Sequence, residues 1–430
     1  MESIKAIRET KGTEKIIVAS KPQGAEKPAK SQADFPQDHV SKTNPNTYIL
    51  SVDNQKTLNH LRALLERKNN SCTIRQELPI IDGMTVEFTP DSQELLQYLK
   101  KIGTSITPER KVHIPEPLQM QKPKPANPQK LNVATQLLNI QKLREEGLTG
   151  KGIGIAVLDT GIAPHPDLKD HIGGFYDMVS DRKKPFDNNR HGTHVSGIIA
   201  GNGKSSDGLY TGIAPEATLV GIKVLDIFGA GSLTDIVSGI QTAIKNKDKY
   251  NIKVINMSLG GYVKDPYKKD PIAQAAAKAV EKGITVVVSA GNSGPYPGTI
   301  ISPANSPDVI GVGAMNPKTN GIAWFSSRGP TKYDNLFKPD VVAPGVDITS
   351  TTNDSDGYIV LSGTSMASPM VSGTIALLLQ KNPDLTPAQI KEILMSTAKS
   401  VAKPGYDRND QGKGLINPPE ALKKAQERSN

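Results

Sequence analysis

Apolar residues follow two different patterns along the chain, and the change from one to the other divides it. Between residues 47 and 116, short alternating runs are separated by stretches in which apolar residues lie three or four positions apart. Alternation predicts strands with one buried face, and the longer period predicts amphipathic helices. Beyond residue 131 the apolar runs are continuous, which is typical of strands buried on both faces of a parallel sheet.

The first region, residues 47–116, is predicted to be a small α+β unit. Its expected strands are 48–52, 84–88 and 112–115, and its expected helices are 57–67 and 90–101. One further strand, before Met84, has no clear signal in the sequence. The order β-α-β-β-α-β predicts a ferredoxin-like sandwich. Residues 1–46 are polar and are expected to form a disordered tail. Residues 117–130, rich in Pro, Lys and Gln, are expected to be an exposed linker with a processing site.

The second region, residues 131–425, is predicted to be one large α/β domain. Its expected strands are 153–158, 218–224, 254–257, 284–288 and 309–312. Helices are expected to begin at Asp270-Pro271, an N-cap followed by an N1 proline, and at the capping box that Thr386 opens. This alternation of strands and helices predicts a mostly parallel sheet in a three-layer α/β/α arrangement.

Composition and charge exclude several classes of function. The formal net charge of the 430 residues is +9, but Lys and Arg are interleaved with Asp and Glu, which favours a solvated surface over nucleic-acid binding. No stretch approaches the roughly 20 apolar residues of a transmembrane helix, so we expect no membrane partner. No signal peptide precedes the first region, so a cytoplasmic location is expected, with secretion as the alternative. Cys72 is the single cysteine and has no partner motif for catalysis.

Three polar clusters of the large domain are candidates for chemistry. Asp159 ends a predicted buried strand, and His191 and Ser365 each lie at a predicted helix start. Alone, each has a structural explanation, as a turn cap, a packed histidine or a helix N-cap. Together they have the residue types of a nucleophilic triad, in which His191 takes the proton of Ser365 and Asp159 orients the imidazole. Pro369 is expected in the first turn of the last helix, which places the helix start close to Ser365.

A fourth cluster and several alternatives complete this interpretation. Asn292 follows a predicted strand between glycines, where its amide could donate to an oxyanion, although an Asn in such a turn also occurs for structural reasons. His191 and His194 lack the intervening Glu and the third ligand of a metal site, and His194 is expected to be a packed helix residue. A single Asp-Thr-Gly argues against an aspartic protease. The glycine run 150–154 precedes its strand, which argues against dinucleotide binding.

The blocks around Asp159, His191, Asn292 and Ser365 resemble the signatures of the subtilase family (peptidase S8), and 363–369 is the most specific of them. The resemblance spans about 131–425 and implies a subtilisin-like fold and a serine endopeptidase that cleaves proteins and peptides through an acyl-enzyme. The substrate-binding residues that it implies are Gly229, Ala230, Gly231, Ser258, Leu259, Gly260, Ala290 and Gly291. The region 47–116 resembles the inhibitory propeptide of the family, so a self-processing zymogen inhibited by its own propeptide is expected. The blocks at Asp159 and His191 are similar to an intracellular, AprX-like branch.

Cofactor, specificity and rival functions follow from the same resemblance. No cofactor is required for the chemistry. Where many subtilisins have a calcium loop, only Asn202 and Asp207 are candidate ligands, which leaves a structural Ca²⁺ open and no metal residue assigned. The candidate pocket floor, 299–303, has no acid and predicts broad or apolar specificity. A specialised processing protease of the same fold, such as a lantibiotic leader peptidase, is the alternative; a pseudoprotease is disfavoured because all three triad residues are present.

Overall fold

The computed structural model describes residues 44–115, 130–401 and 405–428. The predicted tail 1–46, apart from its last three residues, and the predicted linker 117–130, apart from Lys130, lie outside the described residues. None of the described helices is long and apolar enough to cross a membrane.

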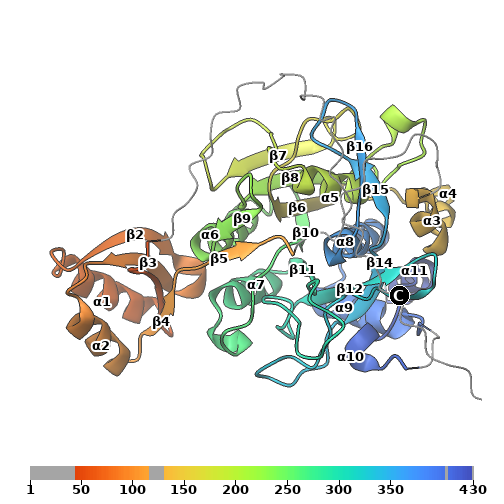
Figure 1. The fold of residues 1–430 in the computed structure, drawn as a ribbon. Helices are drawn as coiled ribbons and strands as arrows, with labels where there is room; N and C mark the ends of the chain where they lie inside the picture. Colours follow the sequence, from red (N-terminus) through yellow and green to blue (C-terminus); the bar gives the residue numbers. More distant parts are fainter. Residues whose placement is uncertain (1–43, 116–129, 402–404, 429–430) are drawn as a thin grey trace, which may run out of the picture. The chain divides into compact units, whose positions relative to one another are not determined.

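An eight-stranded sheet forms the centre of the large domain (Figure 1). Its strands are β6 (Gly154–Asp159), β7 (Ile172–Asp177), β8 (Thr218–Lys223), β10 (Ile252–Met257), β11 (Thr285–Ser289), β12 (Ile310–Asn316), β13 (Gly321–Ile322) and β14 (Val341–Pro344). The main path runs β13-β12-β11-β10-β6-β8-β7, and β14 pairs with β12. All pairs are parallel except β12 with β13. The predicted mostly parallel sheet is confirmed.

Helices cover both faces of this sheet. Successive side chains of each strand point to opposite faces, so each strand contributes to two cores. Ile155 and Val157 of β6 belong to the core that includes α5 (His191–Ala200) and α8 (Thr364–Lys381). Ala156 and Leu158 belong to a second core with α6 (Leu233–Lys245) and α7 (Pro271–Glu281). The remaining helices of this domain are α3 (Lys130–Leu137), α4 (Ile140–Glu145), α9 (Pro387–Thr397), α10 (Arg408–Gln411) and α11 (Pro418–Glu427), with 3-10 turns η2 (Lys204–Ser206) and η3 (Tyr267–Lys269).

The helix starts that the sequence marks are present in the structure. Asp270 caps α7 by accepting hydrogen bonds from the N–H groups of Ile272 and Ala273. Thr386 and Gln389 form the predicted capping box of α9. Pro369, however, lies inside α8 and not in its first turn, so that part of the prediction is wrong. The carbonyl of Ser365 therefore has no N–H four residues further on, and it takes a hydrogen bond from elsewhere, as described below.

A second, four-stranded antiparallel sheet forms the small unit. Its strands are β1 (Thr47–Ser51), β2 (Cys72–Leu78), β3 (Gly83–Phe88) and β4 (Ser105–Pro108), with helices α1 (Gln55–Glu66) and α2 (Gln93–Lys101) and the 3-10 turn η1 (Pro79–Ile81). The order β-α-β-β-α-β is as predicted. The fourth strand is β4, however, and not 112–115. Residues Lys111–His113 form β5, which pairs with β9 (Ala230–Ser232) of the large domain.

The strand that the sequence leaves unmarked is β2, and its surroundings explain why. A register shift interrupts its pairing with β3 between Ile74 and Gln76. Gln76 donates from Nε2 to Oγ of Ser238 in α6 at 2.6 Å. Thr85 of the neighbouring β3 shares a 2.7 Å hydrogen bond with Thr234, also in α6. Because polar side chains make these contacts with the large domain, the strand lacks a clean apolar alternation.

A buried ion-pair cluster joins three distant segments of the large domain. Lys338 is 1% exposed, and its Nζ donates to Asp340 Oδ2 at 2.6 Å and to the carbonyl of Val309 at 3.1 Å. Lys391 of α9 contacts the other carboxylate oxygen of Asp340 at 3.0 Å. Burial lowers the pKa of Lys338 to about 8, although Asp340 acts in the opposite direction. The cluster therefore depends on each charge retaining its partner.

We expect Lys338→Met to lower the free energy of unfolding by about 3 kcal/mol, because Asp340 then loses its closest counter-charge inside the protein. The matched control is Lys318→Met, which removes one half of an exposed ion pair with Asp347 and should change the free energy by less than about 1 kcal/mol. Urea unfolding measures both values. Equal losses in the two variants would contradict the importance of burial.

Candidate active site

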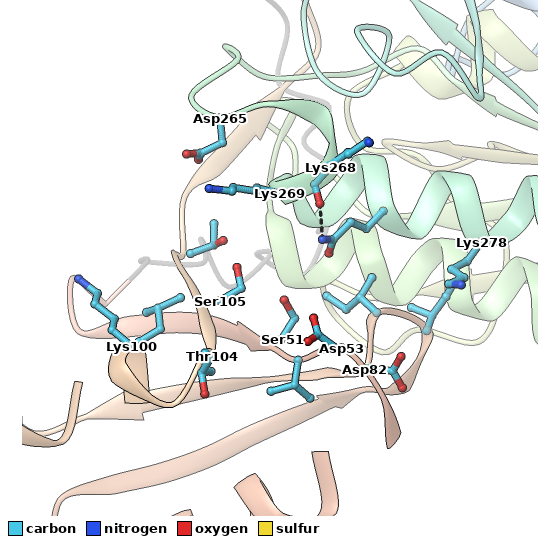
Figure 2. Close-up of a pocket in the computed structure, with 17 residues that line it drawn as sticks. Ser51, Asp53, Asp82, Lys100, Thr104, Ser105, Asp265, Lys268, Lys269 and Lys278 are labelled. Atoms are coloured by element: carbon cyan, nitrogen blue, oxygen red, sulfur yellow. Dashed lines mark hydrogen bonds between the residues drawn. The ribbon is translucent and has the colours of Figure 1, made fainter. Parts of the chain in front are cut away.

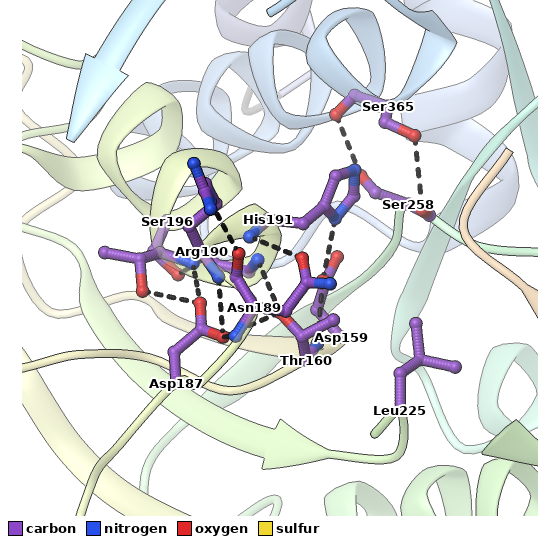
Figure 3. A network of polar contacts seen from close by, with 12 residues as sticks. Asp159, Thr160, Asp187, Asn189, Arg190, His191, Ser196, Leu225, Ser258 and Ser365 are labelled. Carbon is purple, nitrogen blue, oxygen red and sulfur yellow. Dashed lines mark hydrogen bonds and ion pairs between the residues drawn. The ribbon is translucent and has the colours of Figure 1, made fainter. Parts of the chain in front are cut away.

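Asp159 is the last residue of β6 and is fully buried. Its Oδ1 lies 2.8 Å from Nδ1 of His191 and accepts the backbone N–H of Thr160 at 2.7 Å (Figure 3). Because an ionised carboxylate can only accept, Nδ1 of His191 bears a proton and Nε2 is the nitrogen left to act as a base. The carboxyl end of the strand thus orients the imidazole.

His191 is the first residue of α5, and one buried carboxylate, that of Asp187, holds this helix start in place. Its two oxygens accept hydrogen bonds of 2.7–3.0 Å from Thr160 Oγ1, from the N–H groups of Asn189, Arg190 and Thr193, and from Thr193 Oγ1. The next helical residue is Gly192, where a Cβ would lie 2.2 Å from the carbonyl oxygen of Gly161. A glycine is therefore required for α5 to approach the end of β6 this closely.

Ser365 is the second residue of α8 and is 1% exposed. Its Oγ donates to the carbonyl of Ser258 at 3.2 Å (Figure 3). The Oγ of Ser258 donates in turn to the carbonyl of Ser365 at 3.0 Å, the carbonyl that Pro369 leaves without a helical partner. Nε2 of His191 is buried and has no hydrogen-bond partner among the described residues. In this state the serine hydroxyl faces Ser258 and not the imidazole.

Asn292 directs its amide N–H₂ toward Pro115, because its side-chain oxygen already accepts two hydrogen bonds from Thr364. Oδ1 accepts the backbone N–H of Thr364 at 3.0 Å and the hydroxyl of the same residue at 2.9 Å. Nδ2 donates to the backbone carbonyl of Pro115 at 3.2 Å. An amide donor beside the nucleophile is the arrangement that stabilises the oxyanion of a tetrahedral intermediate. The carbonyl of Pro115 is the group that this amide contacts in the structure.

Residues 111–114 form an extended strand, called the cleft strand below, that lies between two segments of the large domain. The space that this strand occupies is called the cleft. On one side, β5 pairs antiparallel with β9, which includes Ala230 and Gly231. The N–H of Ile114 donates to the carbonyl of Gly229 at 2.9 Å. On the other side, His113 forms a bridge with Gly260. Two of the three segments assigned to substrate binding by resemblance, 229–231 and 258–260, therefore pair with this strand.

A cavity of about 330 Å³ lies beside Pro115. It is lined by Gly260, Gly261, Tyr262, Asn292, Ser293 and Ile301, together with residues of the cleft strand. Ile301 belongs to the predicted pocket floor, and its N–H donates to the carbonyl of Ala290 at 3.1 Å. Among the residues that line the cavity, none is acidic. Leu259 and Ala290 are fully buried behind this surface, and Gly291 contacts Thr364 through its N–H.

Sequence reasoning missed several residues that position this site. Thr364 hydrogen-bonds to Asn292 directly, whereas Asp187 hydrogen-bonds to Thr160 and to residues at the start of α5. The sequence signal for Asp187 is its position four residues before His191, where an acid can accept hydrogen bonds from the start of the helix. His194, expected to be a packed helix residue, is buried, and its Nε2 lies 3.1 Å from the carbonyls of both Ile348 and Ile359. Burial lowers the pKa of His194 to about 3, so it is neutral.

Comparison with known proteins agrees with this geometry. A model of the Subtilase family (peptidase S8) matches residues 150–414, more than half of the chain. The chain belongs to the subtilase family. Serine protease AprX of Bacillus subtilis (strain 168) is 43% identical over 313 residues, which are 67% of this chain and 70% of that protein. Subtilisin E of the same strain is 42% identical over 279 residues, 64% of this chain and 67% of the relative. Subtilisin DY of Bacillus licheniformis is 41% identical over 284 residues, 65% of this chain and 94% of the relative.

This subtilase is a serine endopeptidase of the subtilisin type, and the family needs no cofactor for catalysis. In the part of the chain that the structure describes, no group of three or more His, Cys, Asp or Glu side chains could hold a metal ion. Near the candidate calcium loop, both oxygens of the buried Asp167 are engaged, by the N–H of Ser205 at 2.8 Å and the hydroxyl of Tyr358 at 2.7 Å. Asn202 Oδ1 accepts the N–H of Lys204.

We expect Asn292→Ala to lower kcat about 10²–10³-fold with little change in KM, because the lost donor acts mainly on the transition state. Thr364→Val removes the hydroxyl that fixes Asn292 and should lower kcat by a smaller factor, on the order of tenfold. Steady-state kinetics on a chromogenic peptide distinguish the two variants. A change in KM alone for Thr364→Val would show that the hydroxyl does not position the oxyanion donor.

Proposed function

We propose that Asp159, His191 and Ser365 form the catalytic triad of this subtilase and that Asn292 provides the oxyanion hole. Ser365 Oγ first rotates from Ser258 toward His191 and attacks the substrate carbonyl carbon, while His191 Nε2 takes its proton. Asn292 Nδ2 donates to the oxyanion of the tetrahedral intermediate. His191 then gives the proton to the leaving amine, and the C–N bond breaks to leave an acyl-enzyme. A water molecule, deprotonated by His191, hydrolyses this ester and restores Ser365.

The observation that carries this proposal is the contact between Asn292 Nδ2 and the Pro115 carbonyl at 3.2 Å. A peptide carbonyl thus contacts the amide that we assign to the oxyanion hole. The strand that delivers this carbonyl is held through main-chain hydrogen bonds on both sides. Such strand addition is a general way to hold an extended peptide, because backbone groups supply most of the contacts.

We expect Ser365→Ala to abolish casein hydrolysis and self-processing, because this variant lacks the proposed nucleophile. Electrophoresis of the full chain follows processing, and N-terminal sequencing of the active wild-type species locates the cut. We expect cleavage within 115–130. A Ser365→Ala chain that still processes itself would refute the assignment of the nucleophile, and a cut elsewhere would refute the processing window.

We propose further that residues 47–116 are an inhibitory propeptide, so that the chain is made as a zymogen. Glu109 supports this role through its contact with the start of α6, where it accepts the N–H of Leu233 at 2.9 Å and the hydroxyl of Thr234. The positive end of a helix stabilises such a carboxylate. The neighbouring Arg110 pairs with Asp270, the N-cap of α7, at 3.0 Å. The propeptide thus contacts the starts of both helices on this face.

A polar cavity in the same contact region favours a separable propeptide. It measures about 730 Å³ and is bounded by residues of the small sheet and of the segment around η3 and α7 (Figure 2). Lys268, Lys269 and Lys278 line it on one side, and Asp53 and Asp82 on the other. Permanent interfaces are more apolar and better packed than this. We therefore expect cleavage at the end of the propeptide to allow its release.

The inhibition should depend on pH through Glu109. Burial raises the pKa of Glu109 above its ordinary value of 4.5, although its hydrogen bonds act in the opposite direction. The complex therefore binds a proton more readily than the free propeptide does, and complex formation is favoured at low pH. We expect inhibition by residues 44–115, added in trans, to weaken as pH rises from 4.5 through the raised value and then to level off.

Inhibition constants measured across this pH range test the prediction. Glu109→Gln should flatten the profile, because the titrating group is gone. Asp91→Asn, at an exposed acid of the propeptide, should keep the wild-type slope. The absence of inhibition at micromolar amounts would refute the inhibitory role, and an unchanged slope in Glu109→Gln would refute the assignment to this carboxyl.

We propose broad specificity with an apolar preference at the residue before the cut. Ile301 lines the cavity beside Pro115, and none of the residues that line this cavity is acidic. The alternative, a specialised processing protease, would favour a basic residue there and would require an acidic wall. Action inside the cell stays a prediction, which fractionation of the producing cells can test.

A further inference from the structure

Pro115 occupies the position where the next pair of hydrogen bonds between the cleft strand and segment 258–260 would form. His113 and Gly260 exchange both of their main-chain hydrogen bonds, at 3.2 and 3.1 Å. In an antiparallel ladder such pairs recur at every second residue, so the next pair joins positions 115 and 258. Proline has no N–H to donate. The carbonyl of Ser258 therefore receives no hydrogen bond from the cleft strand.

The group that the Ser258 carbonyl accepts instead is the hydroxyl of Ser365, at 3.2 Å. Nε2 of His191 is meanwhile buried and has no partner among the described residues. This nitrogen is the base that must take the serine proton in the proposed mechanism. With Pro115 in the cleft, the hydroxyl of Ser365 thus points away from Nε2 of His191. It points toward the carbonyl of Ser258, which would otherwise accept the N–H of a substrate.

The side chain of Pro115 also leaves its pocket incompletely filled. The cavity of about 330 Å³ is what remains with the cleft strand in place. An apolar cavity of about 150 Å³ is already large enough to hold benzene. A larger apolar side chain at position 115 would therefore bury additional surface against Ile301 and the glycine segment 260–261. Pro115 lacks both the backbone donor and the side-chain volume of a well-matched residue.

We propose that Pro115 acts as a brake on self-processing. Because Pro115 has no N–H, the carbonyl of Ser258 accepts the hydroxyl of Ser365 instead and keeps this hydroxyl away from His191. The bond that follows Pro115 is therefore cleaved slowly. A residue with an N–H at this position donates to Ser258, displaces the serine hydroxyl and allows it to turn to Nε2. The inference rests on the proposed function, in which Ser365 is the nucleophile and residues 47–116 are the propeptide.

The first test uses the full chain and follows the conversion of intact to processed protein on gels. We expect Pro115→Ala, which restores the N–H alone, to process itself at least tenfold faster than the wild type. Pro115→Leu, which restores the N–H and also fills the pocket, should be faster still. The matched control is Asp91→Asn, at an exposed acid of the small unit outside the cleft, which should process at the wild-type rate within about threefold. Equal rates in all four chains would overturn the inference.

The second test separates the N–H from the side chain by using peptides. The processed wild-type enzyme is assayed with succinyl-His-Ile-Xaa-p-nitroanilides in which Xaa is Ala, N-methylalanine, Pro or Leu. We expect kcat for Ala to exceed that for N-methylalanine at least tenfold, and N-methylalanine to resemble Pro. Hydrolysis of all four peptides at equal rates would overturn the brake and leave the proposed function intact. No hydrolysis of even the Leu peptide would contradict the proposed function itself.

Discussion

Both faces of the parallel sheet are buried, one beneath α5 and α8 and the other beneath α6 and α7, and this constraint decides where polar groups can be placed. Within the strands, almost every position is apolar because it faces a packed helix. The carboxyl edge is where the chain leaves the sheet, and there β6, β10 and β11 are direct neighbours. Asp159, Ser258 and Asn292 lie at or just beyond the ends of these three strands. The groups proposed to orient the base, contact the nucleophile and face the oxyanion thus lie at one edge of the sheet.

Ser258 links this edge to the start of α8 by compensating for two prolines. Pro369 has no N–H, so the carbonyl of Ser365 takes its hydrogen bond from the hydroxyl of Ser258. Pro115 has no N–H either, so the carbonyl of Ser258 takes its hydrogen bond from the hydroxyl of Ser365. In the proposed brake, the second contact forms because Pro115 occupies the cleft, whereas the first depends only on Pro369. The same pair of serines therefore has one structural contact and one that depends on the occupant.

The proposed propeptide contacts the large domain through several polar groups. Glu109 and Arg110 reach the starts of α6 and α7, and Gln76 and Thr85 contact side chains of α6. Such contacts specify a register between two surfaces, and they remain compatible with water when the surfaces part. In the proposed zymogen, this arrangement suits a domain that recognises its partner and afterwards leaves it.

The sequence by itself determined the local features of this protein. Continuous apolar runs marked five strands of the large sheet, because strands buried on both faces admit few polar residues, and short blocks singled out Asp159, His191, Asn292 and Ser365. Only the tertiary structure decided that residues 111–113 leave the small sheet for the cleft, since an edge strand pairs equally well in either place. Only the structure likewise brought Thr364 and Ser258 into contact with the candidate catalytic groups, and Asp187 into contact with Thr160 and Arg190 beside them. The hydrogen bond between Ser258 and Ser365 joins residues 107 positions apart, and no local pattern records a partner that folding alone brings near.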